Sequence, residues 1–282
     1  FLHQCTDLEA LDVLAAKPPL SAYIGFDCTA TSLHAGSLVS IMLLRLLQNT
    51  GHKPIVLIGD GTTKGGDPSG TDEARKFLGD DDIPANMAGI RDVFAKFLAF
   101  GDGPTDAMMI NNADWLNGLS YIPFLRNYGR YFSVNRMLRL DSVKTRLERQ
   151  QPLSFLEFNY MVLQAYDFLR LYEIDKCGFQ AGGSDQWGNI LGGVDLIRRI
   201  HGADSDGLPR AHGIAYPLVI TASGEKFGKS AGNAPTLDPK QTSPYRLYQF
   251  FLNVADADAV PYLKLFTLLN QLQIGELDVA VK

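Results

Sequence analysis

The sequence predicts an α/β protein, namely a Rossmann-like, doubly wound parallel sheet followed by a helical module. In the first half of the chain, short apolar runs alternate with longer helix-like segments, which is the pattern of βαβ units around a parallel sheet. From Ser243 onward the pattern is helical only. We therefore expect a second, helical module to begin at Ser243.

The expected elements follow from the apolar runs and the residues that flank them. A strand at 22–26 leads to a nearly all-apolar helix at 38–49 that stops before Gly51, and such a helix must be covered on most sides. A second strand is expected at 54–58. Further strands are expected at 107–110, 177–181 and 216–220, and helices at 86–99, 120–148, 154–171, 190–200, 244–252 and 256–272.

Composition excludes several classes of protein. The 282 residues include 26 basic and 31 acidic ones, a net charge of −5, and 46% are hydrophobic, so the chain is neither a wholly basic nucleic-acid coat nor disordered. The three cysteines form no CxxC or Cys/His cluster, which argues against a disulfide framework or a zinc site and favours the cytoplasm. Because neither an apolar run of about 18 residues nor a signal-like N-terminus occurs, we expect no membrane association.

Charge is uneven along the chain. Residues 126–149 contain seven basic and two acidic residues, which makes this stretch a candidate phosphate-facing surface. The charges alone leave a solvated helix face equally open.

Residues 29–37 connect the first expected strand to the apolar helix. They place His34 and small residues at a helix N-terminus, where free backbone amides and the helix dipole favour negative charge. Gly36 leaves room for a ligand to approach the backbone. The turn is a candidate phosphate or nucleotide site, although a histidine there is more often only a capping or surface residue.

A second candidate is the loop Gly224–Gly232, which carries Lys226 and Lys229 between glycines. Two ammonium groups on a flexible strap can close over a polyphosphate and neutralise the charge that develops there. The loop is not a Walker A motif, because Ser223 stands where that motif needs a glycine. Taken alone, an exposed turn is the simpler interpretation.

The expected helix at 154–171 begins with a capping box formed by Ser154 and Glu157. At about 100° per residue, Tyr160, Gln164 and Asp167 fall within about 60° of one another, on one face of an otherwise apolar helix. An unpaired buried carboxylate is costly, so Asp167 needs a donor. A ligand hydroxyl or ammonium can supply it, and so can a structural hydrogen-bond network.

Two glycine-rich segments, 59–70 and 180–189, follow expected strands. Both would lie at the carboxyl edge of the sheet, where ligands bind in open α/β folds. The second segment brings Asp185 and Gln186 close to the start of the next expected helix. Singly, each segment could be only a tight turn.

In combination, these motifs resemble a known family. Residues 34–37 resemble the HIGH signature and residues 226–230 the KMSKS signature of class I aminoacyl-tRNA synthetases. Residues 182–189 look like the signature of tyrosyl-tRNA synthetases in particular. The same holds for residues 23–27, 66–70, 132–135 and 160–167. The likeness covers almost the whole chain, which resembles a bacterial-type tyrosyl-tRNA synthetase lacking most of its C-terminal tRNA-binding region.

The resemblance implies that tyrosine and ATP give tyrosyl-adenylate and pyrophosphate, and that tyrosine then passes to tRNA-Tyr. The family's catalytic positions match Thr29, His34, Lys226, Lys229 and Ser230. Its tyrosine-binding positions match Tyr23, Asp67, Tyr160, Gln164, Asp167 and Gln186. Its ATP-binding positions match Asp27, Gly36, Ser37, Gly183, Asp185 and Lys229. Its acceptor-stem positions match Arg198 and Arg199.

The resemblance also implies partners. ATP enters as a substrate with Mg²⁺, and neither a tightly bound cofactor nor a carboxylate cage for a metal is expected. The family forms homodimers, and Phe155 and the 120–150 helices lie where the interface would be. Residues 1–222, with an inserted helical region around 117–150 for the dimer and the acceptor stem, would then be the catalytic domain. Residues 223–282 would hold the lysine loop and the start of the anticodon-side domain. No editing domain is expected.

Two positions depart from the family pattern. Ser37 replaces the second histidine of HIGH, and Thr71 stands where a basic residue often follows the 66–70 motif. We therefore expect the ATP contact of that histidine and one loop charge to be absent, for which Lys64, Arg75 or Lys76 could compensate.

Two alternatives remain open. A tryptophanyl-type synthetase has the same fold and the same ATP motifs, but Tyr23 and Asp167 suit a phenol. A non-catalytic RNA-binding descendant would have no need of His34, Lys226 and Lys229 together.

Overall fold

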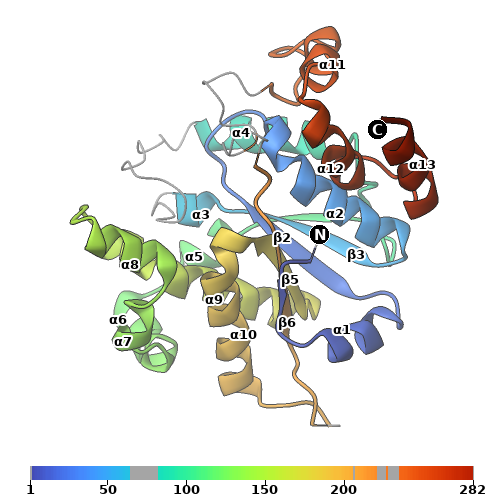
Figure 1. Ribbon diagram of the computed structural model, residues 1–282. Helices are drawn as coiled ribbons and strands as arrows, with labels where there is room; N and C mark the ends of the chain where they lie inside the picture. The colour runs from blue at the N-terminus through green and yellow to red at the C-terminus, as the bar shows by residue number, and fades with distance from the viewer. Residues whose placement is uncertain (1, 64–81, 206, 221–226, 228–234, 282) are drawn as a thin grey trace.

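The computed structural model describes residues 2–63, 82–205, 207–220, 227 and 235–281. A six-stranded sheet lies at its centre, with helices packed on both faces (Figure 1). The last helices of the chain form a group beside α2, which runs along one face of the sheet.

The bounds of the elements are as follows. The strands are β1 (Gln4–Cys5), β2 (Ser21–Phe26), β3 (Lys53–Ile58), β4 (Met108–Asn111), β5 (Phe179–Gly183) and β6 (His212–Tyr216). The longer helices are α1 (Leu8–Ala15), α2 (Leu38–Asn49), α4 (Asp82–Phe94), α6 (Tyr121–Asn127), α8 (Asp141–Glu148), α9 (Phe155–Asp175), α10 (Trp187–His201), α11 (Pro244–Leu252), α12 (Asp256–Phe266) and α13 (Gln271–Val281). Single helical turns are η1 (Ala35–Ser37), α3 (Asp60–Thr63), α5 (Ala113–Leu116), η2 (Gly129–Tyr131), α7 (Val134–Met137) and η3 (Ser184–Gln186).

The order of the strands creates a switch point in the middle of the sheet. The order is β1-β6-β5-β2-β3-β4, and all neighbours run parallel except β1, which pairs antiparallel with β6. From β2 the chain builds outward through β3 and β4, and it then returns to the other side of β2 with β5. In such a sheet a crevice opens at the carboxyl ends of the two strands where the direction reverses. The predicted doubly wound, Rossmann-like sheet is confirmed.

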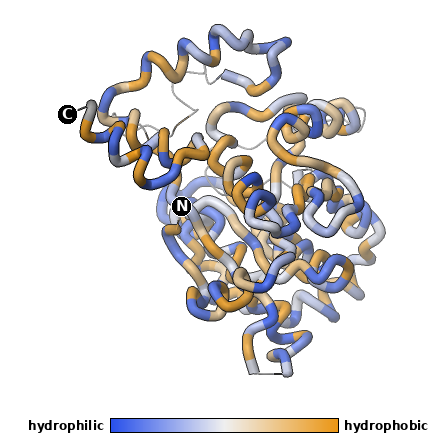
Figure 2. The backbone as a smooth tube through the Cα atoms, turned by 90° about the vertical axis from the view of Figure 1, so that its right-hand side faces the viewer, coloured by the Kyte–Doolittle hydropathy of each residue, from blue (hydrophilic) through white to orange (hydrophobic). Residues whose placement is uncertain are grey.

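Alternation along the central strands divides the core into two layers. Ile24 of β2 and Val56 of β3 pack in one hydrophobic cluster with α2 and α4, whereas Tyr23 and Leu57 pack in the other with α9 and α10. This is the period of two that a pleated strand imposes. Figure 2 shows hydrophobic and hydrophilic residues interspersed along the helices of the chain.

Several predicted elements are confirmed, and α2, α11 and the capping box at the start of α9 are found where they were predicted. The fourth strand, β5, begins two residues later than expected. The fifth was wrong: β6 covers His212–Tyr216, not 216–220, because its pairing with β5 rather than local propensity sets its position. The 256–272 segment forms two helices, α12 and α13, instead of one.

The stretch at 120–148 is helical, but it divides into four short pieces, α6, η2, α7 and α8, with breaks at 128, 132–133 and 138–140. Strand β1 was not expected. In the described part of the chain, no helix is both long enough and apolar enough to cross a membrane.

Gly193 lets α9 and α10 pack closely. A Cβ at Gly193 would lie 2.7 Å from Cδ1 and 3.0 Å from Cβ of the buried Phe168, whereas at the neighbouring Gly192 it would meet no atom closer than 3.8 Å. We expect Gly193→Ala to lower the free energy of unfolding by about 1–3 kcal/mol through overpacking. Gly192→Ala, the matched control, should be neutral or stabilise by up to about 1 kcal/mol, because alanine has the higher helix propensity. Urea unfolding of both variants checks this, and equal midpoints would contradict it.

Candidate active site

A cavity of about 790 Å³ opens at the switch point, along the carboxyl ends of β2 and β5. Its walls come from β2 and the segment that follows it, from α9, from β5 with η3, and from residues 216–219. The crevice that the strand order predicts is therefore present.

The cavity gathers the described residues that the sequence predicted for catalysis and for tyrosine and ATP binding. These are Tyr23, Asp27, Thr29, His34, Gly36, Ser37, Tyr160, Gln164, Asp167, Gly183, Asp185 and Gln186. Asp67, Lys226, Lys229 and Ser230 lie outside the described residues, as does Thr71. Arg198 and Arg199 lie on α10, beyond the residues that line the cavity.

Asp167 is a buried carboxylate at one end of the cavity. It is 2% exposed, and it accepts hydrogen bonds from Asn112 Nδ2 at 2.9 Å and from Trp115 Nε1 at 2.7 Å. Burial raises its pKa to about 7, against the two hydrogen bonds, which lower it. Because an ionised carboxylate can accept about four hydrogen bonds, Asp167 retains capacity for a ligand donor.

Tyr23 faces the same end of the cavity from β2. Its ring packs against Phe168 with centroids 5.3 Å apart, and its side chain is almost fully buried. Burial, followed by the charge of Asp167, raises the pKa of the Tyr23 phenol well above its ordinary value. The phenol therefore stays protonated and can donate a hydrogen bond.

Three buried polar atoms of this cavity lack a hydrogen-bond partner among the described residues. They are the Tyr23 hydroxyl, Gln164 Oε1 and Gln180 Oε1. A buried polar atom left unpaired costs about 1–3 kcal/mol, so native structures rarely leave several in one place. Because all three residues line the same cavity as Asp167, they favour a ligand whose polar groups complete the hydrogen bonding.

Sequence reasoning missed Asn112, Trp115 and Gln180. Asn112 is fully buried directly after β4, and it also donates to Thr62 Oγ1 at 3.0 Å. Its amide oxygen accepts from the backbone of Gly61 at 2.8 Å. The available signal was position, because a polar residue just past a parallel strand lies at the binding edge of the sheet.

His34 and Gly36 form a tight turn at the other end of the cavity. His34 caps η1, and its Nδ1 accepts a hydrogen bond from the Gly36 backbone at 3.0 Å. A Cβ on Gly36 would lie 2.7 Å from His34 Cε1 and 3.0 Å from the Phe227 carbonyl oxygen, so only glycine fits. Gly36, Ser37 and the first turn of α2 border the cavity, which is the arrangement that favours phosphate.

Phe227, the described residue of the lysine loop, is anchored beside this turn. Its backbone N–H donates to Val219 O at 2.8 Å, and its ring packs among aromatic side chains of α11 and α12. Past the loop, Pro235 O accepts from the Ala35 backbone at 2.9 Å. Phe227 and Pro235 therefore both lie next to the turn formed by His34 and Gly36.

Tyr216 is another lining residue that the sequence did not single out. Its hydroxyl lies 2.5 Å from Ser40 Oγ and joins the end of β6 to α2. Burial raises the pKa of Tyr216 to about 12, so this hydrogen bond persists across the physiological pH range.

Metal-type clusters and disulfides are not found in the part of the chain that the structure describes. No group of three or more His, Cys, Asp or Glu side chains there is placed to hold a metal ion. Cys5, Cys28 and Cys177 are free thiols.

Known proteins resemble this chain in sequence over nearly its whole length. The family model for class I tRNA synthetases (W and Y) matches residues 15–279. The chain is 59% identical to a tyrosine–tRNA ligase of Rhodospirillum rubrum and 57% identical to one of Caulobacter vibrioides. Both alignments cover 99% of this chain and 65% of the relative, so the chain spans about two thirds of these proteins.

Solved structures show the same fold. A C-terminally truncated Aspergillus nidulans mitochondrial tyrosyl-tRNA synthetase has a TM-score of 0.84 at 31% identity, over 99% of this chain and 80% of that one. A tryptophanyl-tRNA synthetase of Aeropyrum pernix has a TM-score of 0.67 at 16% identity, over 97% and 73%. The second likeness shows the fold alone.

The raised pKa of Asp167 predicts a pH-dependent stability. A folded-state pKa of about 7 against an ordinary value of 3.8 means that the folded chain binds this proton more tightly than the unfolded chain. The resulting contribution to the free energy of unfolding is complete below the unfolded pKa, and it is lost as pH rises through 7. The Asp167→Asn variant has no carboxyl at this position and therefore lacks this pH-dependent contribution. In urea unfolding without ligand, the wild type should gain stability relative to the variant between about pH 8 and about pH 5, whereas a constant difference would refute burial as the cause.

Proposed function

We propose, from the premise that this chain belongs to the class I tRNA synthetases (W and Y), that it activates tyrosine with ATP. Tyrosyl-adenylate and pyrophosphate would form first, and tyrosine would then pass to tRNA-Tyr. The buried Asp167 carboxylate opposite the unpartnered Tyr23 hydroxyl is the observation that supports tyrosine as the substrate. The tyrosine–tRNA ligases that the chain resembles support the same reaction.

In the proposed site, Asp167 and Tyr23 recognise the phenol hydroxyl of the substrate. That hydroxyl donates to Asp167 and accepts from Tyr23. A substrate without the hydroxyl leaves both groups unpaired, which is the strongest basis for rejecting an otherwise similar molecule. Gln164, Tyr160 and Asp67 are assigned to the substrate ammonium, and Gln186 to its carboxylate.

The nucleotide end of the proposed site lies at the His34 turn. Asp27, Ser37 and the backbone of Gly36 and Gly183 are assigned to the adenosine and its phosphates, and Asp185 to the ribose. A Cβ on Gly183 would lie 2.6 Å from Asp185 Oδ1, so a larger residue at 183 would displace the side chain assigned to the ribose.

Activation requires no general base in this proposal, because the attacking tyrosine carboxylate is already ionised at neutral pH. Rate enhancement comes from alignment of the two substrates and from donors aimed at the charge on the phosphate and the departing pyrophosphate. Thr29, His34, Lys226, Lys229 and Ser230 are assigned to this work. Anchoring of Phe227 beside His34 supports the assignment for the loop lysines.

Mg²⁺ is proposed to enter with ATP as a counter-ion of its phosphates. The described residues provide no acidic cage for the ion, so we assign no catalytic step to it.

The proposal extends to tRNA and to a second copy of the chain. Arg198 and Arg199, exposed on α10, are assigned to the acceptor stem. Large apolar side chains stand exposed on the insertion and at the start of α9, with Tyr121 at 58%, Ile122 at 68% and Phe155 at 65%. Such a patch suits the homodimer interface. A cytoplasmic location, and a division into domains 1–222 and 223–282, belong to the same proposal.

Pyrophosphate exchange tests the activity directly. With ATP and labelled pyrophosphate, tyrosine should drive exchange, and phenylalanine or tryptophan at the same concentration should not. Exchange that tryptophan drives in preference would move the chain to the tryptophanyl branch. Absence of exchange with all three amino acids would refute the proposal.

Tyr23→Phe removes one of the two groups that read the phenol. We expect kcat/KM for tyrosine to fall roughly 3- to 10-fold, the worth of one neutral hydrogen bond, and kcat/KM for phenylalanine to change little. Discrimination between the two amino acids therefore narrows. Tyr172→Phe, a change of the same kind outside the cavity, is the control. Equal effects of Tyr23→Phe on both substrates would argue against hydroxyl reading.

A further inference from the structure

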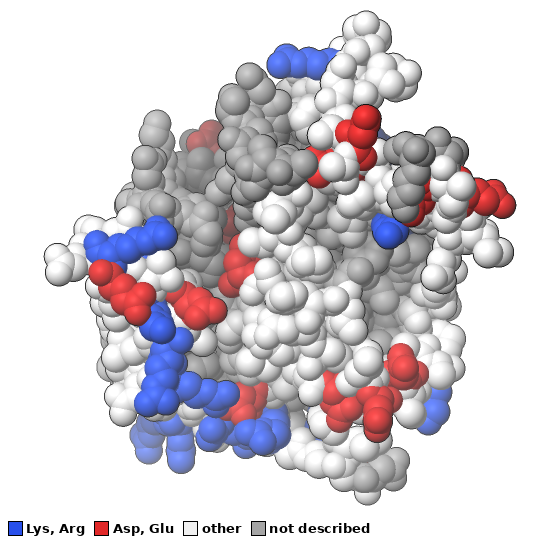
Figure 3. Space-filling view, viewed as in Figure 1, with Lys and Arg blue, Asp and Glu red and all other residues white. Residues whose placement is uncertain are grey.

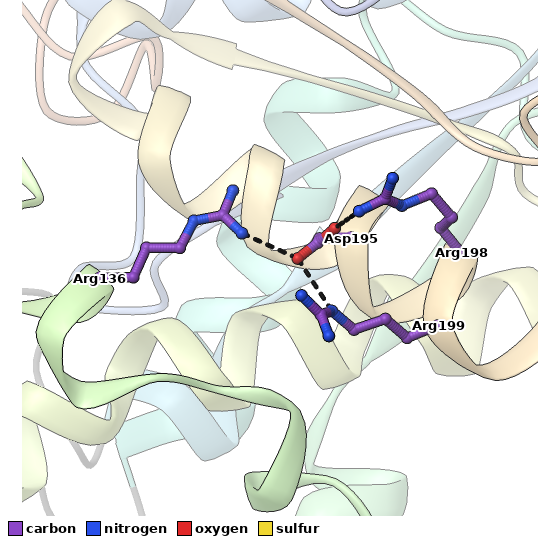
Figure 4. Close-up of polar contacts among 4 residues, drawn as sticks. All are labelled: Arg136, Asp195, Arg198 and Arg199. Carbon is purple, nitrogen blue, oxygen red and sulfur yellow. Dashed lines mark hydrogen bonds and ion pairs between the residues drawn. The ribbon is translucent and has the colours of Figure 1, made fainter.

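A single carboxylate on the outer part of α10 binds three arginines. Asp195 Oδ2 accepts from Arg136 Nη1 at 3.0 Å and from Arg199 Nε at 3.1 Å, and its Oδ1 accepts from Arg198 Nη2 (Figure 4). Arg198 and Arg199 belong to the same helix as Asp195, one turn further along. Arg136 comes from α7 in the insertion, so the cluster joins two separate parts of the chain.

The arginine cluster carries excess positive charge. One carboxylate against three guanidinium groups leaves a formal charge of +2. Burial opposes ionisation of Asp195, but the hydrogen bonds from Arg198 and Arg199 lower its pKa below the ordinary value, so the carboxylate remains charged. The arginines are 63%, 67% and 43% exposed at positions 136, 198 and 199, whereas the Asp195 side chain is only 16% exposed.

Donors remain available on all three guanidinium groups. Each has five N–H donors in a planar fork, and the contacts with Asp195 use one on each arginine. Forks of this kind match phosphate oxygens in pairs. Basic side chains also gather over the neighbouring insertion helices (Figure 3).

An apolar hollow adjoins the arginine cluster. Its volume is about 110 Å³, and Arg136, Asp195 and Arg199 stand at it together with Tyr131, Phe132 and Leu191. A hollow with aromatic walls beside guanidinium groups suits an unstacked nucleobase whose phosphate lies on the cations. Gly188 and Met161 also line it, and each lies within two residues of a residue that lines the main cavity.

Helix α10 fixes the distance between the arginine cluster and the main cavity. From Trp187, next to Gln186, to Arg198 the helix rises about 16 Å. About five stacked nucleotides span this length at 3.4 Å each. An RNA strand whose end enters the cavity therefore places a phosphate near the arginines.

We infer that Arg136, Arg198 and Arg199 form one phosphate-binding site for the backbone of an RNA acceptor end, with Asp195 as its positioning residue. This inference rests on the proposed function and adds to it a third contact, from the insertion, and an acidic residue that improves binding of a polyanion. Without Asp195, the three guanidinium groups would repel one another and spread apart.

Binding of a hairpin RNA tests the inference. The probe is a fluorescent acceptor-stem hairpin with a single-stranded 3′ end, and anisotropy gives its Kd over a series of salt concentrations. Arg136→Gln should raise Kd roughly 3- to 10-fold and reduce the salt slope by about 1. Arg91→Gln, the same charge change on α4 across the sheet, should do neither. Equal effects of the two variants would overturn the inference.

Asp195→Asn separates positioning from simple charge. The substitution raises the local charge from +2 to +3, so charge alone predicts tighter RNA binding, whereas loss of positioning predicts weaker binding. We expect Kd to rise at least threefold, and an unchanged or lower Kd would overturn the role of Asp195. Tyrosine-dependent pyrophosphate exchange should be unchanged in all these variants. If the wild type catalyses pyrophosphate exchange but Arg136→Gln leaves the Kd for the RNA unchanged, the further inference fails and the proposed function stands. If the wild type catalyses no exchange, the proposed function is refuted.

Discussion

The constraint on which the site depends is a carboxylate held in a nearly dry environment. Asp167 keeps its place because Asn112 and Trp115, both from the segment that follows β4, donate hydrogen bonds to it, and the charge of Asp167 acts on the nearby Tyr23 phenol. Two hydrogen bonds offset part of the free-energy cost of burying Asp167. The carboxylate can still accept further hydrogen bonds, and the Tyr23 hydroxyl lies unpartnered in the same cavity. Together they favour a ligand that donates and accepts hydrogen bonds at one atom. A phenol hydroxyl has this property.

The topology of the sheet gives the Asp167 region and the proposed nucleotide region a common cavity. Because β2 and β5 meet where the strand order reverses, the turn after β2 and the turn after β5 lie side by side. Helix α10 starts at that point, and Asp195, Arg198 and Arg199 lie near its other end. A single helix therefore sets the distance between the cavity and the proposed RNA contact. Asp195, whose side chain is 16% exposed, has a different role from Asp167. It positions arginine side chains at the surface, whereas Asp167 is proposed to bind the substrate directly.

The sequence predicted elements best where local pattern and tertiary structure agree. The apolar run of α2, bounded by Gly51, has no alternative to a covered helix, and the stripe of Tyr160, Gln164 and Asp167 follows from helical geometry. Strand β6 was misplaced because His212 and Gly213 have weak strand propensity, and only pairing with β5 makes them a strand. The hydrogen bonds of Asn112 and Trp115 with Asp167, and of Arg136 with Asp195, join residues more than 50 positions apart. The periodicity of a sequence cannot predict such contacts.

The most direct test measures the titration of Asp167 itself. With carboxyl-carbon-labelled aspartate, NMR of the protein and of Asp167→Asn assigns the signal, and its pKa is followed with and without tyrosine. We expect a pKa of about 7 without ligand, falling by at least about one unit with tyrosine, because a hydroxyl that donates to the carboxylate favours the charged form. Phenylalanine at saturation should not lower it. An ordinary aspartate pKa, or one that tyrosine leaves unchanged, would contradict this account of the site.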